Sequence, residues 1–213
     1  MYNYEEIYQT MKKAAKFALI KTIPIFLGYL FLGIAFGLLL QKSGLSVFWA
    51  FLISTLVYAG SMQFALVGIL TGGLSYVTTA VMTLFINSRH AFYGLTFIQR
   101  FKEMRKTYPY MVFSLTDETY SLLCSMARPA DFTDREWKAA TFFTAFFDQC
   151  YWIAGSVLGA LMGELITFDT TGIDFAMTAL FVVIALDQWR SYRKHLPAVL
   201  GAGVTVLLSL IHI

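Results

Sequence analysis

Between Lys42 and Arg89 the chain passes through 46 consecutive positions without a charged residue. A soluble domain of 213 residues cannot hide so long a run in its core, whereas one membrane-spanning helix needs about 20 apolar residues. Charged residues make up 14% of the chain, against roughly 25% in soluble domains. These features predict an all-α, polytopic membrane protein in which residues 1–213 form a single transmembrane domain.

Composition and motifs argue against several other classes. The net charge of +3 comes from bases between apolar segments, which is typical of cytoplasmic loops and does not indicate nucleic acid. The sequence contains no P-loop, metalloprotease or nucleophile-elbow motif, so we expect neither an enzyme nor a bound cofactor or metal. Cys124 and Cys150 both lie in apolar segments and are interpreted as small buried residues, not as a disulfide.

About seven apolar segments follow one another, and turn-forming residues separate them. They are 22–41, 47–70, 74–99, 110–127, 139–163, 173–187 and 196–213, with all four prolines at segment ends. Residues 1–21 precede them and are not a cleavable signal peptide, because they contain Glu5 and Glu6. Of residues 1–21, the stretch 4–18 is predicted to form an amphipathic helix that lies on the membrane surface. Its lipid-facing side chains would be Ile7, Met11, Ala14, Ala15 and Ala18.

The charges of the loops constrain the topology. Bases in the N-terminal region and in 187–195 place both on the cytoplasmic side, and the acidic loop 164–174 suits the outside. Loops 100–106 and 128–138 are also basic, yet a full span over 110–127 would put them on opposite sides. Either the charge rule is violated, or segments 47–70 and 110–127 each enter and leave on one side or are broken within the membrane, as in many transporters.

Three segments place polar residues on one helical face, which suggests a bundle around a polar path. Thr79, Thr83, Asn87, His90 and Gly94 share a face of 74–99, and Thr141, Thr144, Asp148, Trp152, Gly155 and Gly159 share one of 139–163. In 110–127 the corresponding set is Ser114, Asp117, Glu118, Ser121, Cys124 and Ser125.

Each of these features also has a structural interpretation. Arg89 and His90 would also suit an interfacial anchor, and Asp117 and Glu118 the surface if 110–127 lies flat. Asp148 would also suit a hydrogen bond to a neighbouring helix. Gly33 and Gly37, like Gly155, Gly159 and Gly163, are spaced as close helix-packing faces. The stretch from Tyr58 through Gly60 and Ser61 to Gln63 suits either packing or an unwound ligand site.

In order along the chain, a set of short motifs resembles the AzlC family, the large subunit of bacterial branched-chain amino-acid exporters. The motifs are Pro24 with Gly28, Gly33 and Gly37; Tyr58-Ala-Gly-Ser-Met-Gln-Phe64; Asn87-Ser-Arg-His90 with Tyr93-Gly94; Thr116-Asp-Glu118 with Tyr120; Trp152 with Gly155, Gly159 and Gly163; and Gly172-Ile-Asp-Phe175 with Ala179-Leu-Phe181. The resemblance implies export of valine-like amino acids across the bacterial inner membrane, together with a small four-helix subunit of the AzlD type. Because the family usually continues beyond this length, we expect the C-terminus to be truncated.

We therefore expect a secondary exporter of branched-chain or similar neutral amino acids; the alternative is a permease or assembly subunit of an ATP-driven transporter without transport of its own. A helix break near Gly60 and Ser61 would bind the substrate carboxylate through free N–H groups. One of Asp117, Glu118 and Asp148 would bind the ammonium group or carry a coupling proton. Asp148 is expected to face the bundle interior, with Asn87, Arg89 or His90 as its partner, and Phe64, Phe85 and Phe146 to line the side-chain pocket.

Overall fold

The computed structural model describes residues 4–165 and 195–211, together with Phe175, Val182, Leu186 and Trp189. Its described secondary structure is entirely helical, as predicted, and the chain divides into two compact units, Met1–Thr170 and Thr171–Ile213. In the first unit the helices are α1 (Tyr4–Lys42), α2 (Val47–Leu56), α3 (Gly60–Gly72), α4 (Tyr76–Lys102), the short 3-10 helix η1 (Arg105–Thr107), α5 (Tyr108–Phe113), α6 (Asp117–Ser125) and α7 (Asp134–Leu165). The second unit contains α9 (Leu196–Ile211), preceded by a stacked pair of rings, Trp189 and His195, whose centroids are 4.1 Å apart.

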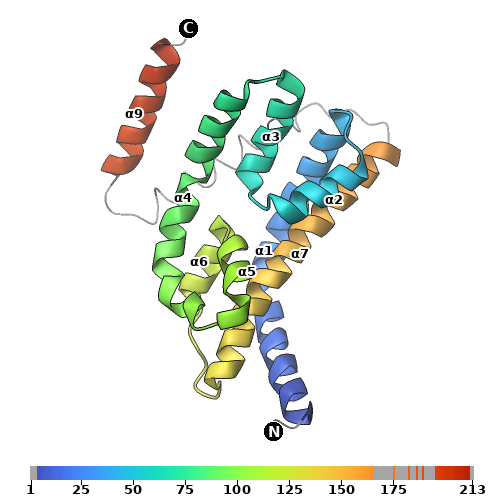
Figure 1. Cartoon of the computed structure of the whole chain (residues 1–213), viewed down its shortest axis with the longest axis vertical. Helices are drawn as coiled ribbons and strands as arrows, with labels where there is room; N and C mark the ends of the chain where they lie inside the picture. The colour runs from blue at the N-terminus through green and yellow to red at the C-terminus, as the bar shows by residue number, and fades with distance from the viewer. Residues whose placement is uncertain are drawn as a thin grey trace. The chain divides into compact units, whose positions relative to one another are not determined.

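Helices α1 and α7 run side by side in the same direction and form the spine of the first unit (Figure 1). Near their starts Lys13 pairs with Glu136 at 3.2 Å, and near their ends Gln41 lies against Gly163. Between these points the backbones touch, because a Cβ atom on Gly37 would lie 2.1 Å from the Ser156 carbonyl oxygen. The predicted glycine packing faces are therefore confirmed and belong to one interface.

Helix α1 differs from the prediction in its length. It continues from the N-terminal region into the first apolar segment, so 4–18 is not a separate surface helix, and Pro24 lies inside the helix instead of at its end. Ala14 and Ala18, predicted to face lipid, are fully buried. Ala14 packs against Phe132 and Ala140, since the small side chains allow α7 and the preceding loop to approach closely. Among the described residues, α1 is the one helix whose length and hydropathy by themselves suit a membrane crossing.

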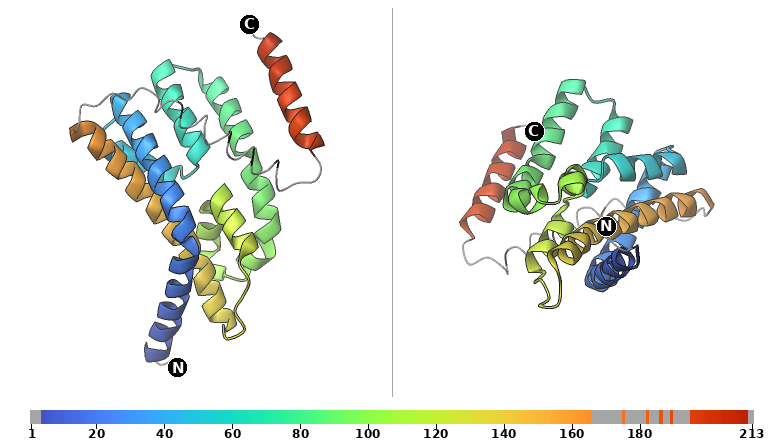
Figure 2. Two further views of the ribbon diagram at one scale, coloured as in Figure 1. Left: turned by 180° about the vertical axis from the view of Figure 1, so that it is seen from behind. Right: turned by 60° about the horizontal axis from the view of Figure 1, so that its bottom comes forward.

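The segments 47–70 and 110–127 are both broken in the middle. Tyr58 lies in the first break with a positive φ of 36°, and α3 begins again at Gly60. The second break ends at Thr116, whose hydroxyl group accepts a hydrogen bond from the N–H of Thr119 and caps α6. The pair α2–α3 lies towards the end of the unit where α1 and α7 finish, and the pair α5–α6 lies towards the end where they begin (Figures 1 and 2). Each pair forms a hairpin, so the predicted break in each of the two segments is confirmed.

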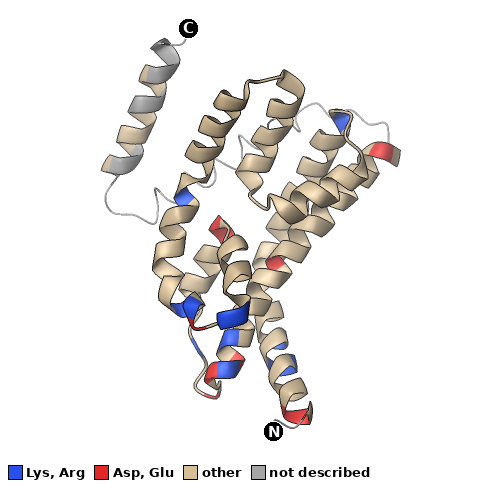
Figure 3. Cartoon of the chain, in the orientation of Figure 1, with Lys and Arg blue, Asp and Glu red and all other residues tan. Residues whose placement is uncertain are grey.

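The hairpins bring the basic loops together at one end. Lys13 pairs with Asp131 at 3.0 Å, and Lys138 pairs with Glu103 at 3.2 Å, so 100–106, 128–138 and the N-terminal helix share that end (Figure 3). The hydrogen bond from Lys13 lowers the pKa of Asp131, and the Thr133 N–H, which donates to Glu136, lowers the pKa of that carboxyl group. Residues 187–194 of the second basic loop lie outside the described residues, apart from Trp189.

Helix α4 shows the predicted separation of faces. Thr83, Asn87, His90 and Gly94 are half-buried, while the opposite face exposes large apolar side chains, including Leu84, Phe85, Phe92 and Leu95. The helix begins after a turn in which Gly73 adopts a φ of 62°, and Ser75 caps it through the N–H of Thr78. An exposed apolar face of this length suits contact with lipid or another membrane helix.

Candidate functional site

The two helix breaks meet against the middle of α7. The Gln149 side chain accepts a hydrogen bond from the Tyr110 hydroxyl at 2.8 Å and donates to the Thr55 carbonyl oxygen at 3.3 Å. The Thr55 carbonyl group lies at the end of α2, just before the first break, where the helical hydrogen bonds stop. Gln149 therefore donates to a carbonyl group that would otherwise have no partner in its own helix. Across the breaks, the rings of Tyr58 and Phe113 lie 6.2 Å apart.

Arg89 joins the first turns of α3 and α6. Its guanidinium group contacts the Asp117 carboxylate at 2.7 Å and donates to the Ser61 hydroxyl at 2.7 Å. Arg89 is therefore an internal ion-pair partner and not a free interfacial anchor. The Arg89 Nε atom and the Asp117 Oδ1 atom are buried and have no hydrogen-bond partner among the described residues, so both groups retain bonding capacity.

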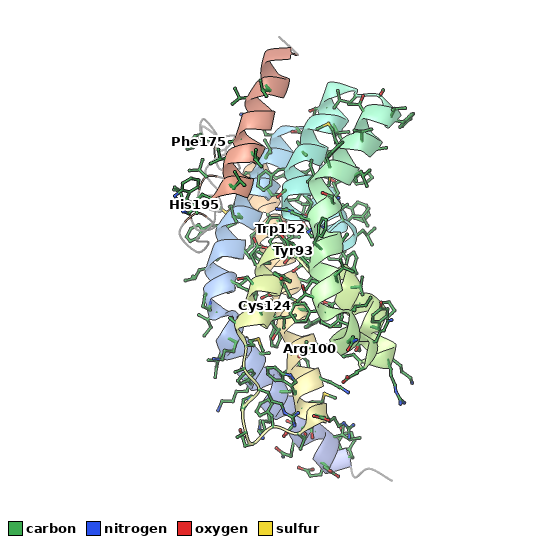
Figure 4. The ribbon with its side chains drawn as sticks, turned by 90° about the vertical axis from the view of Figure 1, so that its left-hand side faces the viewer. Tyr93, Arg100, Cys124, Trp152, Phe175 and His195 are labelled. Atoms are coloured by element: carbon green, nitrogen blue, oxygen red, sulfur yellow. The ribbon has the colours of Figure 1, made fainter. Side chains whose placement is uncertain are left out.

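The first turn of α3 lies on an aromatic surface. Its leading N–H groups, beginning at Gly60, have no acceptor inside the helix. A Cβ atom on Gly60 would meet the Trp152 ring at 3.4 Å, and the Trp152 indole N–H donates to Gln63 at 2.7 Å. Gln63 is fully buried and also donates to Ser54 at 3.3 Å, so its amide group ties α2, α3 and α7 together. Figure 4 shows Trp152 and Tyr93 at a similar level along the unit, with Arg100 closer to the end where α1 begins.

Asp148 and Glu118 are joined by a chain of hydroxyl groups. Thr119 donates to Asp148 at 2.8 Å, and Thr116 donates to Thr119 at 3.2 Å. The Tyr29 hydroxyl lies 2.7 Å from that of Thr116 and donates to Glu118 at 2.8 Å. Asp148 is fully buried, and its Oδ1 atom has no partner among the described residues. The buried atoms that share this lack of a partner are Tyr58 Oη, Asn87 Oδ1, Arg89 Nε, Ser114 Oγ, Asp117 Oδ1 and Asp148 Oδ1.

Most of the predicted site residues converge here, but not all of the predicted pairs form. Asp148 faces the interior, yet its partner is Thr119 and not Asn87, Arg89 or His90. His90 instead lies with its ring 5.9 Å from that of Tyr93. Asp117 and Glu118 are both engaged with other helices, so the flat surface helix is wrong.

Only one of the three rings predicted to line the side-chain pocket is buried. Phe64 is buried, whereas Phe85 and Phe146 are 74% and 41% exposed. Phe85 lies on the outer face of α4, because it stands two positions before the half-buried Asn87.

The polar face predicted over 110–127 is correct for Ser114, Asp117 and Glu118 and wrong for its later members. That prediction assumed one continuous helix, but the break at 114–116 resets the rotation of the chain before α6. Thr119 and Leu123 are buried, whereas Ser121, Cys124 and Ser125 are exposed. Cys124 is therefore not a buried residue, and Cys150 is half-buried.

Sequence reasoning missed the hydroxyl groups that join Glu118 to Asp148. Tyr29 lies in an apolar segment without a polar neighbour on either side, so nothing in the pattern singled it out. Thr116 carried a usable signal: a threonine followed by Asp117 and Glu118 is a helix start, with a cap and acidic residues in the first turn. Placing a helix start there would have located the second break and the side chain of Thr119.

Comparison with known proteins identifies the family. The AzlC protein family matches residues 24–166. The branched-chain amino acid transport protein AzlC of Bacillus subtilis (strain 168) is 37% identical over 185 residues, which cover 87% of this chain and 72% of that protein. An uncharacterized membrane protein of Helicobacter pylori (strain J99) is 36% identical, covering 92% and 84%, and the inner membrane protein YgaZ of Escherichia coli (strain K12) is 27% identical, covering 87% and 77%. No solved structure matches the chain. The chain belongs to the AzlC family.

Proposed function

We propose that this chain is a multi-pass inner-membrane exporter of branched-chain or similar neutral amino acids. It acts as the large subunit of a two-component, secondary active system, together with a small AzlD-like four-helix membrane subunit. Membership of the AzlC family and the transport function named for the Bacillus subtilis relative support this proposal. The apolar outer surface and the two opposed hairpins are the features expected of a membrane transporter.

The observation that carries the proposal is the Arg89–Asp117 pair between two helix starts. A neutral amino acid is a zwitterion, so its site needs a donor for the carboxylate and an acceptor for the ammonium group. Arg89 Nε and the leading N–H groups of α3 supply the donors, and Asp117 Oδ1 supplies the acceptor. The buried rings of Phe64 and Trp152 provide an apolar wall beside the same helix start.

Efflux of labelled valine from cells tests the proposal, with and without the small subunit. Arg89→Gln should abolish efflux, because it removes the positive charge and with it the ion pair between Arg89 and Asp117 at the start of α6. Arg100→Gln is the matched control, since Arg100 is a part-buried arginine of the same helix whose partner, Thr141, lies outside the site. Lack of efflux of valine and other neutral amino acids with both subunits present would overturn the proposal. Efflux that persists without an ion gradient but requires ATP would favour the ATP-driven alternative.

A further inference from the structure

We infer that Glu118 and Asp148 share one exchangeable proton through the hydroxyl groups of Tyr29, Thr116 and Thr119, and that this proton is the coupling ion. The coupling role rests on the proposed transport function. The shared proton itself rests on the geometry, in which two carboxylates close the ends of one continuous chain of hydrogen bonds.

A count of hydrogen atoms shows why one proton fits. This chain of hydrogen bonds contains four oxygen–oxygen contacts: Glu118 to Tyr29, Tyr29 to Thr116, Thr116 to Thr119, and Thr119 to Asp148. Its three hydroxyl groups supply three hydrogen atoms, since each hydroxyl group donates once. With both carboxylates ionised, one contact therefore places two acceptor oxygens together without a hydrogen atom. A single proton on either carboxyl group fills all four contacts.

The chain of hydrogen bonds also provides a route for the proton between the Asp148 and Glu118 carboxyl groups. When Asp148 carries the proton, its carboxyl group donates to Thr119, Thr119 to Thr116, Thr116 to Tyr29, and Tyr29 to the Glu118 carboxylate. When Glu118 carries it, every donor reverses. Each hydroxyl group passes on one hydrogen and receives another, so the proton moves from one carboxyl group to the other with no change in total charge. Relays of this kind are typical of intramembrane acidic residues in transporters.

The surroundings favour sharing over full ionisation. Asp148 is fully buried, and within the described residues neither it nor Glu118 has an ion-pair partner. The positive charge of Arg89 also acts on Glu118, but Arg89 already pairs with Asp117. The other titratable groups that interact with the two carboxyl groups are Asp117, whose negative charge adjoins Glu118, and four tyrosines: Tyr29 of α1, Tyr58 of the first break, Tyr93 of α4 and Tyr110 of α5. Two carboxylates without a base in one buried site cannot both ionise easily, so the pair holds a proton.

Infrared difference spectroscopy of the purified protein during a pH titration measures the shared proton without requiring transport. We expect one protonated carboxyl group, whose C=O band changes in both Asp148→Asn and Glu118→Gln. Thr119→Val should separate the titration into two independent carboxyl groups, whereas Thr119→Ser should retain the wild-type band. Thr144→Val is the control, because Thr144 is a buried threonine one turn before Asp148 that bonds to Ala140 and Met126 and not to the chain. Two independent carboxyl groups in the wild type, or a band that Thr119→Val leaves unchanged, would overturn the inference.

A transport assay tests the coupling role separately. Thr119→Val should affect valine exchange in liposomes much less than proton-driven efflux, since exchange needs no net proton movement. It should lose proton-driven efflux by roughly a hundredfold, the lower end of what positioned proton transfer contributes. Equal proton-driven efflux in Thr119→Val and the wild type would refute the coupling role. Absence of exchange in the wild type would instead count against the proposed function, and the infrared result would still decide whether the proton is shared.

Discussion

Replacing Gly159 by alanine tests whether the contact between α1 and α7 positions the site. The added Cβ atom would lie 2.1 Å from the Ile34 carbonyl oxygen and 2.7 Å from the Ile34 Cα atom, whereas ordinary contact begins at 3.4 Å. Backbone atoms cannot rotate away, so the helices must separate by about 1 Å. Overpacking of this kind costs about 1–3 kcal/mol, and the helix gain of alanine over glycine returns only about 0.5–1 kcal/mol. We therefore expect a net loss of up to about 2.5 kcal/mol.

The separation should also reach the hydroxyl chain. The carbonyl oxygen of Tyr29 would lie 2.9 Å from a Cβ atom on Gly155, so the backbone that carries the Tyr29 hydroxyl group belongs to the same tight interface. Moving α1 away from α7 would lengthen the contacts of Tyr29 with Thr116 and Glu118, which are 2.7 and 2.8 Å in the structure. Valine efflux in Gly159→Ala should consequently fall by more than the loss of folded protein explains.

Thermal unfolding in detergent and efflux per folded molecule measure the two effects. Gly28→Ala is the matched control, because Gly28 also lies in α1 but a Cβ atom there would meet nothing within 4 Å. That variant should be as stable as the wild type or gain up to about 1 kcal/mol. Equal melting temperatures and equal efflux for Gly159→Ala and Gly28→Ala would refute the reasoning.

Three further predictions follow from the arrangement of the helices. Gln149→Leu should lower the free energy of unfolding by about 1–3 kcal/mol, because it leaves the part-buried Thr55 carbonyl group without its partner. Chemical unfolding of purified protein measures this, and Gln99→Leu, at a position outside the site, is the comparison. In a background without Cys124 and Cys150, a cysteine at Ser43 should react with a membrane-impermeant reagent added outside cells and one at Thr133 should not; the opposite pattern would invert the proposed orientation. Lys13→Met should lower the melting temperature at neutral pH. The pKa values of Asp131 and Glu136 are lowered in the folded state, so the stabilisation by these ionised carboxylates is lost when they are protonated. The difference in melting temperature between Lys13→Met and the wild type should therefore disappear as the pH falls below about 4.

The features that local chemistry determines were predictable from the sequence. Glycines spaced four apart indicate a close helix contact wherever they meet a second such pair, and Gly33 and Gly37 meet Gly155 and Gly159. The conflict between two basic loops and a full span over 110–127 left two possibilities, a violation of the charge rule or a broken segment, and the structure contains the break. Both arguments use rules that act within one segment or its flanks.

The partners of the charged residues were not predictable in the same way. Periodicity places Asp148 on the inner face of α7, but it does not say which helix lies opposite. The rotation of α6 depends on the three residues of the break at 114–116, whose backbone angles follow no helical repeat. Asp117 and Glu118 therefore point to different neighbours although they are adjacent, one to Arg89 of α4 and the other to Tyr29 of α1.

Asp117 and Glu118 lie in the same helical turn but differ in the kind of partner that they have. Asp117 pairs with Arg89 at 2.7 Å, so its charge is compensated, and in the proposed site its Oδ1 atom is the acceptor for the ammonium group. Glu118 accepts from the Tyr29 hydroxyl and has no ion-pair partner among the described residues, so in our inference its charge depends on the proton it shares with Asp148. Because both follow Thr116 at the start of α6, a small rotation of that turn would move the substrate ligand and the proton chain together. Within the proposed function, binding and proton occupancy would be coupled through one short helix.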